Sequence, residues 1–333
     1  MMKPIIIAEA GVNHNGSLDM ALKMVDAAAA AGADFVKFQT FKAEKLVTAE
    51  SAAADYQKEN CDAENQLSML KDLELPLQAF RTIAGHCREK GIGFLSTPFD
   101  IESINFLSSL DMRYMKIPSG EITNLPYLRV IAKTKIPVIL STGMSTLADV
   151  ENALQVLYDG GYYRKDITVL HCTTQYPTNY KDVNLKAMIT LREAFGVNVG
   201  YSDHTRGIDI PLAATALGAS VIEKHFTLDK SLPGPDHIAS LDPDELAKMI
   251  EGVQHVAMAL GSSVKRVTLT ERKNMAVARK SIVAASEINQ GEVLSENNIT
   301  VKRPGTGISP MRWDEVIGRR AIRHFNPDEL IEI

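Results

Sequence analysis

Ionisable and hydrogen-bonding side chains recur at the ends of short apolar runs along this sequence. In chain order, these end groups are Glu9, Lys37, Gln39, Thr97, Lys116, Ser119, Ser141, Thr142, Thr174, Tyr176, Ser202, His204, Glu223 and His225. A lone lysine at such a place is usually solvated, and a lone histidine is usually a hydrogen-bonded core residue. Convergence of so many groups on one rim would instead make a catalytic site.

Two of the histidines indicate a metal site. Residues two apart on a strand share a face, so Ser202 lies on the side of His204, and Glu223 on the side of His225. Neighbouring strands lie about 4.8 Å apart, so both imidazoles can reach one ion. Two nitrogen ligands without a thiolate leave an open site. This suits Mn²⁺ or Mg²⁺ better than a closed structural zinc, and such an ion would act as a Lewis acid on a carbonyl.

The lysines and serines indicate a site for a small anion. Lys37 and Lys116 supply positive charge, and the turns containing Gly120 and Gly143 bring backbone N–H groups near a bound phosphate. Hydroxyl donors come from Ser119, Ser141 and Ser202. Together these groups suit a ligand that carries both phosphate and carboxylate.

Eight β-branched runs alternate with amphipathic stretches, which predicts parallel strands joined by helices. The predicted strands are Ile5–Ala10, Phe35–Thr40, Gly93–Phe99, Tyr114–Ser119, Pro137–Thr142, Ile167–Cys172, Asn198–Asp203 and Ser220–Phe226. Within them Phe38, Asp203 and Lys224 are expected to point away from the polar rim.

Helices are predicted between the strands, including Leu18–Ala31, Leu77–Lys90, Leu147–Tyr158 and a segment from Asp242 to Leu260. Ser145 and Asp242 are the predicted N-caps of the last two. Eight strand–helix units over about 250 residues predict a (β/α)₈ TIM barrel. An open doubly wound sheet is the alternative, and the lack of a GxGxxG turn after the first strand disfavours it.

Two segments interrupt this alternation. A polar, alanine-rich insertion from Phe41 to Gln66 follows the second strand, at the expected catalytic mouth, where it could form a lid or a dimer contact. After the last helix comes a charged stretch without a core pattern. The predicted organisation is therefore a barrel over residues 1–262, a linker over 263–280 and a small C-terminal domain over 281–333.

Composition restricts the partners. The 333 residues are 45% hydrophobic and carry a net charge of −5, which argues against a nucleic-acid or membrane surface. Cys61, Cys87 and Cys172 form no CxxC pair and fit a reducing compartment. No signal peptide or spanning run is evident, so a cytoplasmic protein is expected.

The ordered motifs of the chain resemble those of the sialic acid synthase family. The matching phrases are IIIAEAGVNHNGS, FVKFQT, FLSTPFD, KIPSGE, ILSTGMS, LHCTTQYPT, VGYSDHT, IEKHFTLDKSLPGPDH and VKRPGTGI. The last lies in the tail, which is similar to the antifreeze-like (SAF, β-clip) domain of that family. The resemblance therefore covers both predicted domains.

The resemblance implies a role for each site residue. His204 and His225 would bind the metal. Phosphoenolpyruvate would be held by Lys37, Thr97, Lys116, Ser119, Ser141 and Ser202. The sugar would meet Gln39, Tyr176, Asp236 and, from the tail of a partner subunit, Arg303, which implies a domain-swapped homodimer.

The implied reaction is a nonulosonate synthesis in which carbon 3 of phosphoenolpyruvate attacks an open-chain N-acetylated hexose, water adds to carbon 2, and phosphate leaves. We assign Glu9 to that water and Glu223 to supporting a metal-binding histidine as a hydrogen-bond acceptor. Thr174 stands where synthases using N-acetylmannosamine often have asparagine. CTTQYP is closer to members that take a 2,4-diacetamido-trideoxy hexose to make legionaminic acid.

Two other functions are weighed against the synthase. A Schiff-base aldolase would use Lys37 or Lys116 as a covalent nucleophile, and it predicts borohydride trapping of a lysine with indifference to chelators. A non-enzymatic carbohydrate-binding or ice-binding scaffold is suggested by the tail alone, and it leaves the polar rim of the barrel unexplained.

Overall fold

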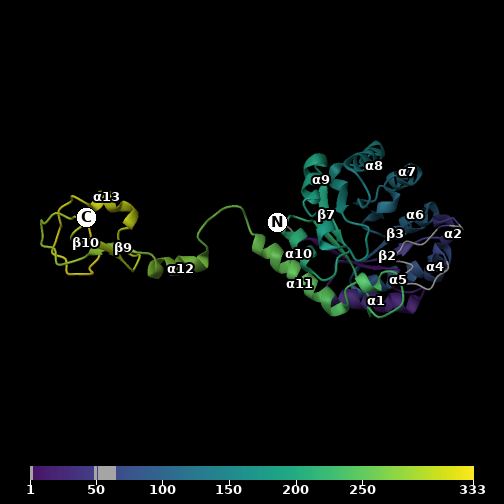
Figure 1. Ribbon diagram of the computed structural model, residues 1–333, viewed down its shortest axis with the longest axis horizontal. Coiled ribbons are helices and arrows are strands. Elements are labelled where there is room, and N and C mark those ends of the chain that lie inside the picture. Colours follow the sequence, from purple (N-terminus) through teal and green to yellow (C-terminus); the bar gives the residue numbers. More distant parts are fainter. Residues whose placement is uncertain (1–2, 49–50, 52–64) are drawn as a thin grey trace. The chain divides into compact units, whose positions relative to one another are not determined.

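Eight parallel strands form the centre of the larger of two compact units, Met1–Gly261 (Figure 1). The computed structural model describes residues 3–48, 51 and 65–333. The strands are β1 (Ile5–Gly11), β2 (Phe35–Thr40), β3 (Gly93–Pro98), β4 (Met115–Ile117), β5 (Val138–Ser141), β6 (Ile167–His171), β7 (Asn198–Asp203) and β8 (Val221–His225). All eight lie within one residue or two of their predicted bounds.

The strand order shows that the sheet is a barrel. It runs β3-β2-β1-β8-β7-β6-β5-β4, so each strand lies beside its sequence neighbour and β1 pairs with both β2 and β8. β3 and β4, at the two ends of this order, pack against each other. A doubly wound sheet would reverse direction at a switch point. The (β/α)₈ prediction is confirmed, and the doubly wound alternative is wrong.

Helices surround the strands (Figure 1). They are α1 (Leu18–Ala31), α5 (Leu77–Lys90), α6 (Ile101–Ser108), α7 (Leu125–Thr134), α8 (Leu147–Asp159), α9 (Ala187–Phe195), α10 (Asp209–Ala216) and α11 (Pro243–Leu260), with short α2 (Ala43–Leu46) and α4 (Gln66–Leu73) after β2. Asp242 caps α11 as predicted. The predicted cap Ser145 is wrong, because Thr146 forms the capping box of α8 with Asp149 and Ser145 donates to the Gly143 carbonyl.

Side chains of alternating parity fill two different cores. Outward residues such as Ile6 and Phe38 pack under the helices. Inward residues form a separate apolar cluster of Ile7, Phe35, Leu95, Ile139, Leu170 and Val221, which fills the lower barrel. Because side chains alternate along each strand, the residues two positions further on face the same interior. Those next residues form the polar floor described below.

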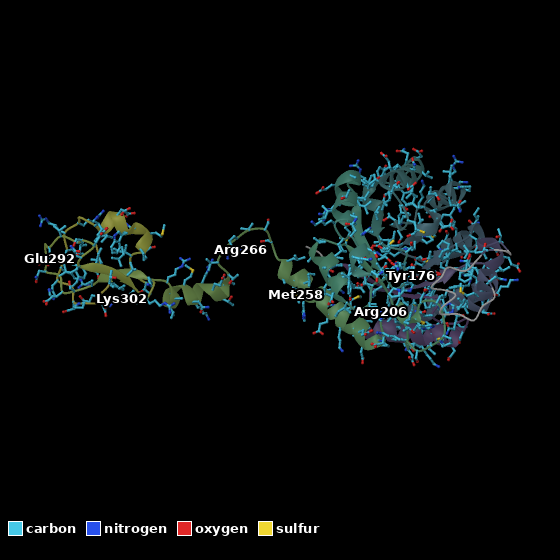
Figure 2. The ribbon with its side chains drawn as sticks, viewed as in Figure 1. Tyr176, Arg206, Met258, Arg266, Glu292 and Lys302 are labelled. Carbon is cyan, nitrogen blue, oxygen red and sulfur yellow. The ribbon has the colours of Figure 1, made fainter. Side chains whose placement is uncertain are left out.

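The C-terminal unit, Ser262–Ile333, has its own small core. It contains α12 (Leu269–Ala278), β9 (Ser281–Ala284), antiparallel β10 (Ile299–Lys302) and α13 (Trp313–Val316). The segment predicted as a linker thus includes a helix, which Thr268 and Glu271 start with a capping box although none of its residues is buried. Glu292 and Lys302 belong to this unit (Figure 2).

Short 3₁₀ turns complete the structure at Ser119–Glu121, Arg164–Asp166, Tyr180–Asp182, His237–Ala239 and Pro310–Arg312. Most of the predicted insertion, residues 49–50 and 52–64 including Cys61, lies outside the described residues. Cys87 and Cys172 are free and buried. Among the described helices, none combines the length and apolar character needed to cross a membrane.

Candidate active site

A cavity of about 500 Å³ opens at the carboxyl ends of the barrel strands. Its lining includes the predicted residues Glu9, Lys37, Gln39, Thr97, Lys116, Ser119, Ser141, Thr174, Tyr176, Ser202, His204, Glu223, His225 and Asp236. One residue predicted on the rim differs. Thr142 is not among the lining residues, because its hydroxyl donates to the Leu170 carbonyl. Arg303, predicted to serve the site of a partner subunit, belongs to the C-terminal unit, where its Nε donates to the Ala278 carbonyl; its role stays a prediction.

The floor of the cavity is a buried cluster of two lysines and two glutamates. Lys37 Nζ lies 2.8 Å from Glu9 Oε2 and donates to Thr97 Oγ1 at 2.9 Å. Lys116 Nζ donates to Ser141 Oγ at 2.8 Å and lies 3.5 Å from Glu223 Oε1. Each of the four charged residues is at most 4% exposed. Their mutual pairing offsets much of the cost of burying four charges.

The two carboxyl groups of this floor titrate differently. Burial raises the pKa of Glu9 to about 7 despite the nearby Lys37 ammonium. Burial also acts to raise the pKa of Glu223, but Lys116 and Lys37 outweigh it and hold that pKa below its ordinary value. Paired carboxyls whose pKa values are pushed apart suit acid–base work. Glu9 is therefore the group that can exchange a proton near neutral pH.

Glu223 plays a different part from the one predicted. Its Oε1 accepts from Ser202 Oγ at 3.0 Å, and its Oε2 lies 3.8 Å from Lys37 Nζ. The expectation that it accepts a hydrogen bond from a metal-binding histidine is wrong for the described contacts, because Glu223 lies two residues deeper on β8 than His225. Its carboxylate holds the lysines and Ser202 in place.

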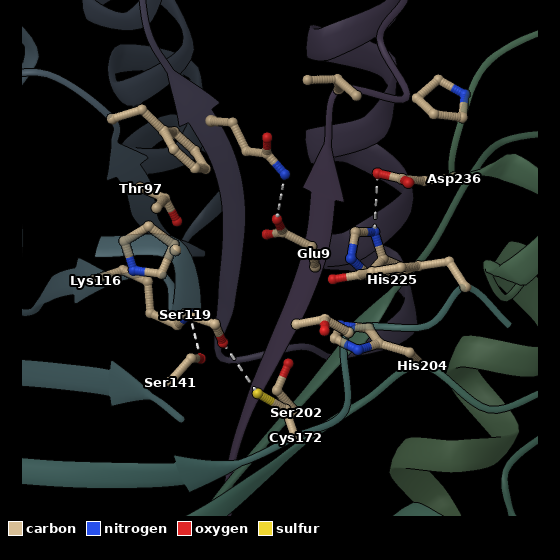
Figure 3. A pocket seen from close by; sticks show the side chains of 18 of the residues that line it. Glu9, Thr97, Lys116, Ser119, Ser141, Cys172, Ser202, His204, His225 and Asp236 are labelled. Atoms are coloured by element: carbon tan, nitrogen blue, oxygen red, sulfur yellow. Dashed lines mark hydrogen bonds and ion pairs between the residues drawn. The ribbon is translucent and has the colours of Figure 1, made fainter. Parts of the chain in front are cut away.

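His204, directly after β7, and His225, at the end of β8, lie above this floor with ring centroids 5.4 Å apart (Figure 3). His204 Nδ1 forms a hydrogen bond with the Thr173 carbonyl oxygen, so its Nε2 is the nitrogen that could coordinate a metal ion. Burial lowers the pKa of His204 to about 4 and holds the pKa of His225 well below its ordinary value. Both imidazoles are thus neutral, the form that binds metals.

The histidine pair fits an open metal site. His225 Nδ1 is buried without a hydrogen-bond partner, with Asp236 Oδ2 3.8 Å away. Over the part of the chain that the structure describes, no three His, Cys, Asp or Glu side chains are grouped to hold an ion. A cation here would therefore take two nitrogen ligands from the protein and the remainder from oxygen atoms of water or substrate.

The mouth of the cavity carries groups suited to a polar ligand. The Tyr176 ring packs on His204 at a centroid distance of 4.1 Å. Gln39 Nε2 donates to Glu9 Oε1 at 3.3 Å. Burial raises the pKa of Asp236 to about 6. These residues come from three different parts of the chain and meet beside the histidines.

Sequence reasoning missed several residues of the cavity. Cys172 lies on the floor with its Sγ 3.3 Å from Ser119 Oγ, and Ser119 Oγ accepts from the Gly143 N–H at 2.9 Å. Parity could have found Cys172, because it lies two residues beyond the inward Leu170. The other missed lining residues lie beyond the strand ends: Val12, Leu46, Val47, Gln66, Met69, Leu70, Leu73, Phe99, Pro118, Met144 and Pro235.

A fully buried ion pair lies behind the histidines. Lys224 Nζ is 2.6 Å from Asp203 Oδ2, both side chains are 0% exposed, and Lys224 also donates to the Thr205 carbonyl. Asp203 accepts in turn from the Thr205 backbone N–H at 3.1 Å. As predicted, both residues point away from the cavity. The pair ties β7 to β8 next to the residues that precede the two imidazoles.

Replacing Lys224 by methionine is expected to lower the free energy of unfolding by about 3–5 kcal/mol, because Asp203 would keep a buried charge without its partner. Urea unfolding followed by circular dichroism measures this loss. The double change Lys224→Met with Asp203→Leu should recover most of it. A single change that costs less than about 1 kcal/mol would show that water reaches the pair.

The loop between β1 and α1 forms hydrogen bonds with the segment 226–240, which contains Asp236. Asn13 Nδ2 donates to the Phe226 carbonyl and to Ser240 Oγ, both at 2.9 Å. Asn15 Nδ2 donates to the Pro233 carbonyl at 2.9 Å. Asn13 therefore bonds both ends of the segment that follows β8, and Asn15 bonds its middle, which holds Asp236 at the mouth.

His14 lies between these asparagines and is 1% exposed. Burial lowers its pKa from 6.5 to about 4. As the pH falls, His14 is therefore protonated near pH 6.5 in the unfolded chain but only near pH 4 in the folded chain. Because the unfolded chain binds the extra proton, the free energy of unfolding is highest above pH 6.5 and decreases as the pH falls from 6.5 to 4. His14→Gln should therefore reduce the loss of unfolding free energy between pH 7 and pH 5 by about 2 kcal/mol. Urea titrations at both pH values test this, and an unchanged difference would contradict it.

Comparison with known proteins agrees with the fold. The model of the NeuB family matches residues 24–265, and that of the SAF domain matches residues 279–332. The N,N'-diacetyllegionaminic acid synthase of Campylobacter jejuni is 52% identical over 99% of both chains. The protein of the same name from Legionella pneumophila is 47% identical over 96% of this chain and 90% of its own.

A solved structure shows the same likeness. The crystal structure of N-acetylneuraminic acid (sialic acid) synthetase from Leptospira borgpetersenii, in complex with citrate, has a TM-score of 0.74 at 34% identity. The match covers 82% of this chain and 90% of that one. The resemblance found in the motifs is thus confirmed over barrel and tail. The chain belongs to the NeuB family and is a sialic acid synthase-type enzyme with a C-terminal SAF domain.

Proposed function

We propose that this nonulosonate synthase condenses phosphoenolpyruvate with an open-chain N-acetylated hexose and releases phosphate. One observation carries the proposal: a buried two-lysine, two-glutamate floor lies in one cavity with two neutral imidazoles. The lysines suit an anionic donor, and the imidazoles suit an ion that polarises a carbonyl. Membership of a sialic acid synthase-type family supports the same reaction.

The donor is assigned to the floor. Lys37 and Lys116 face its phosphate and carboxylate groups, and the hydroxyl donors are Thr97, Ser119, Ser141 and Ser202. Because both lysines are buried, these charge-assisted hydrogen bonds are stronger than in solution. Both lysines already have carboxylate partners, so the floor is ordered before the anion arrives.

His204 and His225 would hold Mn²⁺, with Mg²⁺ or Co²⁺ as alternatives, and the ion would supply Lewis acidity at the acceptor's carbonyl. Carbon 3 of phosphoenolpyruvate forms a bond to the aldehyde carbon, whose oxygen takes a proton. Water then adds to carbon 2, and Glu9 accepts its proton. Cleavage of the C–O bond releases phosphate and leaves a 2-keto acid.

The acceptor is assigned to the mouth, against Gln39, Thr174, Tyr176 and Asp236. A 2,4-diacetamido-trideoxy hexose is favoured over N-acetylmannosamine, because both legionaminic acid synthases above cover nearly the whole chain. Thr174 offers one hydroxyl where an amide could both donate and accept. The partner subunit's Arg303 would complete this subsite in a domain-swapped homodimer of the cytoplasm.

A phosphate-release assay with phosphoenolpyruvate tests the proposal. Release that requires both an acceptor and Mn²⁺, and that EDTA stops, is the expected result. The aldolase alternative draws on Lys116, whose pKa burial lowers. It predicts lysine trapping by borohydride and activity in EDTA, and either result would overturn the synthase mechanism. The non-enzymatic scaffold is set aside, because the chain belongs to a family of enzymes.

A further inference from the structure

One side of the cavity is lined by apolar side chains that the proposed reaction does not use. Leu46 and Val47 come from the end of α2, and Met69, Leu70 and Leu73 come from α4. We call these five residues the apolar wall. They line the same cavity as Glu9 and the two histidines, so a ligand in the cavity meets both surfaces.

The apolar wall is built into the fold. Met69, Leu70 and Leu73 are buried to 4%, 9% and 7% exposure in a cluster distinct from the barrel cores. That cluster also contains Val12 and Phe41, which follow β1 and β2. The wall therefore stands over the β1–β3 side of the mouth, whereas Tyr176, His204 and His225 come from the β6–β8 side.

A polar acceptor alone does not explain such a wall. A hydroxyl pressed against it would lose its water without gaining a hydrogen bond, whereas a methyl group would gain contact. The diacetamido-trideoxy hexose has more methyl groups and fewer hydroxyl groups than N-acetylmannosamine, as contact with an apolar wall requires. It carries a methyl instead of a hydroxymethyl group at carbon 6, and an acetamido group with a further methyl instead of a hydroxyl at carbon 4.

We infer that the apolar wall receives acceptor methyl groups and thereby selects a 6-deoxy, doubly acetamido-substituted hexose over N-acetylmannosamine. This inference rests on the proposed function and names the residues that set its specificity. Each buried methyl group is worth about a fourfold preference, so two together give roughly fifteenfold. Removal of the buried hydroxyls adds to this preference.

The wild-type enzyme provides the first test. Phosphate release at saturating phosphoenolpyruvate is measured with N-acetylmannosamine, its 6-deoxy analogue and the 2,4-diacetamido-trideoxy hexose. The value of kcat/KM should rise about fourfold at each step. A 6-deoxy analogue no better than N-acetylmannosamine would overturn the inference. No release with any acceptor would instead overturn the synthase function itself.

A matched pair of variants on α4 provides the second test. Leu70→Asn places an amide in the wall, while Leu67→Asn makes the same change at a residue that packs on the same cluster but does not line the cavity. Leu70→Asn should reduce the preference for the diacetamido-trideoxy hexose at least fourfold with KM for phosphoenolpyruvate unchanged, and Leu67→Asn should retain the preference. Val47→Thr, nearly isosteric and half-buried, repeats the test with less risk to folding. An undiminished preference in both wall variants would refute the inference.

Discussion

Replacing His225 by alanine is expected to lower phosphate release from phosphoenolpyruvate by about 10³-fold, because a Lewis-acidic ion contributes several kcal/mol of charge stabilisation at a carbonyl. Among the residues that the structure describes, two histidines line this cavity, so the loss of one leaves a single imidazole ligand. Calorimetric titration with Mn²⁺ should show the same loss directly, without any turnover. Phosphoenolpyruvate itself should still bind, because the lysine floor is intact.

His255→Ala is the control for this experiment. His255 lies on α11 with a side chain 64% exposed, near Glu251 and far from the barrel strands in sequence. This variant should keep wild-type Mn²⁺ affinity and turnover. If His225→Ala retained tight Mn²⁺ binding, the ion would have other ligands and the assignment of the histidine pair would be wrong.

Replacing Glu9 by glutamine is expected to lower kcat by about 10²–10⁴-fold, since a glutamine amide cannot accept the proton of the attacking water. Glu9 is 2% exposed, and burial raises its pKa to about 7, which suits a base that works near neutrality. The KM for phosphoenolpyruvate should not rise, because Lys37 loses a competing carboxylate and keeps its charge. Steady-state phosphate release with both substrates varied separates kcat from KM.

Glu251→Gln on α11 makes the same chemical change at an exposed carboxylate and should leave both constants unaltered. Near-normal turnover of Glu9→Gln would remove Glu9 from the proton-transfer role. In that case its 2.8 Å contact with Lys37 would be a structural contribution only.

The strands and their inward residues could be predicted because a barrel constrains both. Each strand is buried on two faces, so its apolar run has a definite length, and parity assigns the interior side. Glu9, Lys37 and Lys116 follow from that rule. Helix α12 could not be predicted from apolar periodicity, because none of its residues is buried. Thr268 and Glu271, which form its capping box, were the available sequence signal.

The remaining site residues depend on loops, where no period applies. Asp236 lies eleven residues beyond the end of β8 (225 to 236), and long-range hydrogen bonds, among them those from Asn13 and Asn15, hold its segment over the mouth. The resemblance supplied Asp236, but composition and spacing did not. Leu70 was missed for a similar reason, because an apolar helix residue is normally assigned to a core.

The apolar cluster that contains Ile7, Leu95 and Leu170 fills the barrel directly beneath the lysine floor. Because these side chains close the barrel axis, we expect reactants to enter and products to leave through the opening at the carboxyl ends of the strands. In the proposed arrangement, a donor on Lys37 and Lys116 would lie deeper in the cavity than an acceptor against Tyr176 and His204, and the acceptor would cover it. We therefore expect the donor to bind first, which would give the two-substrate reaction a compulsory order of binding.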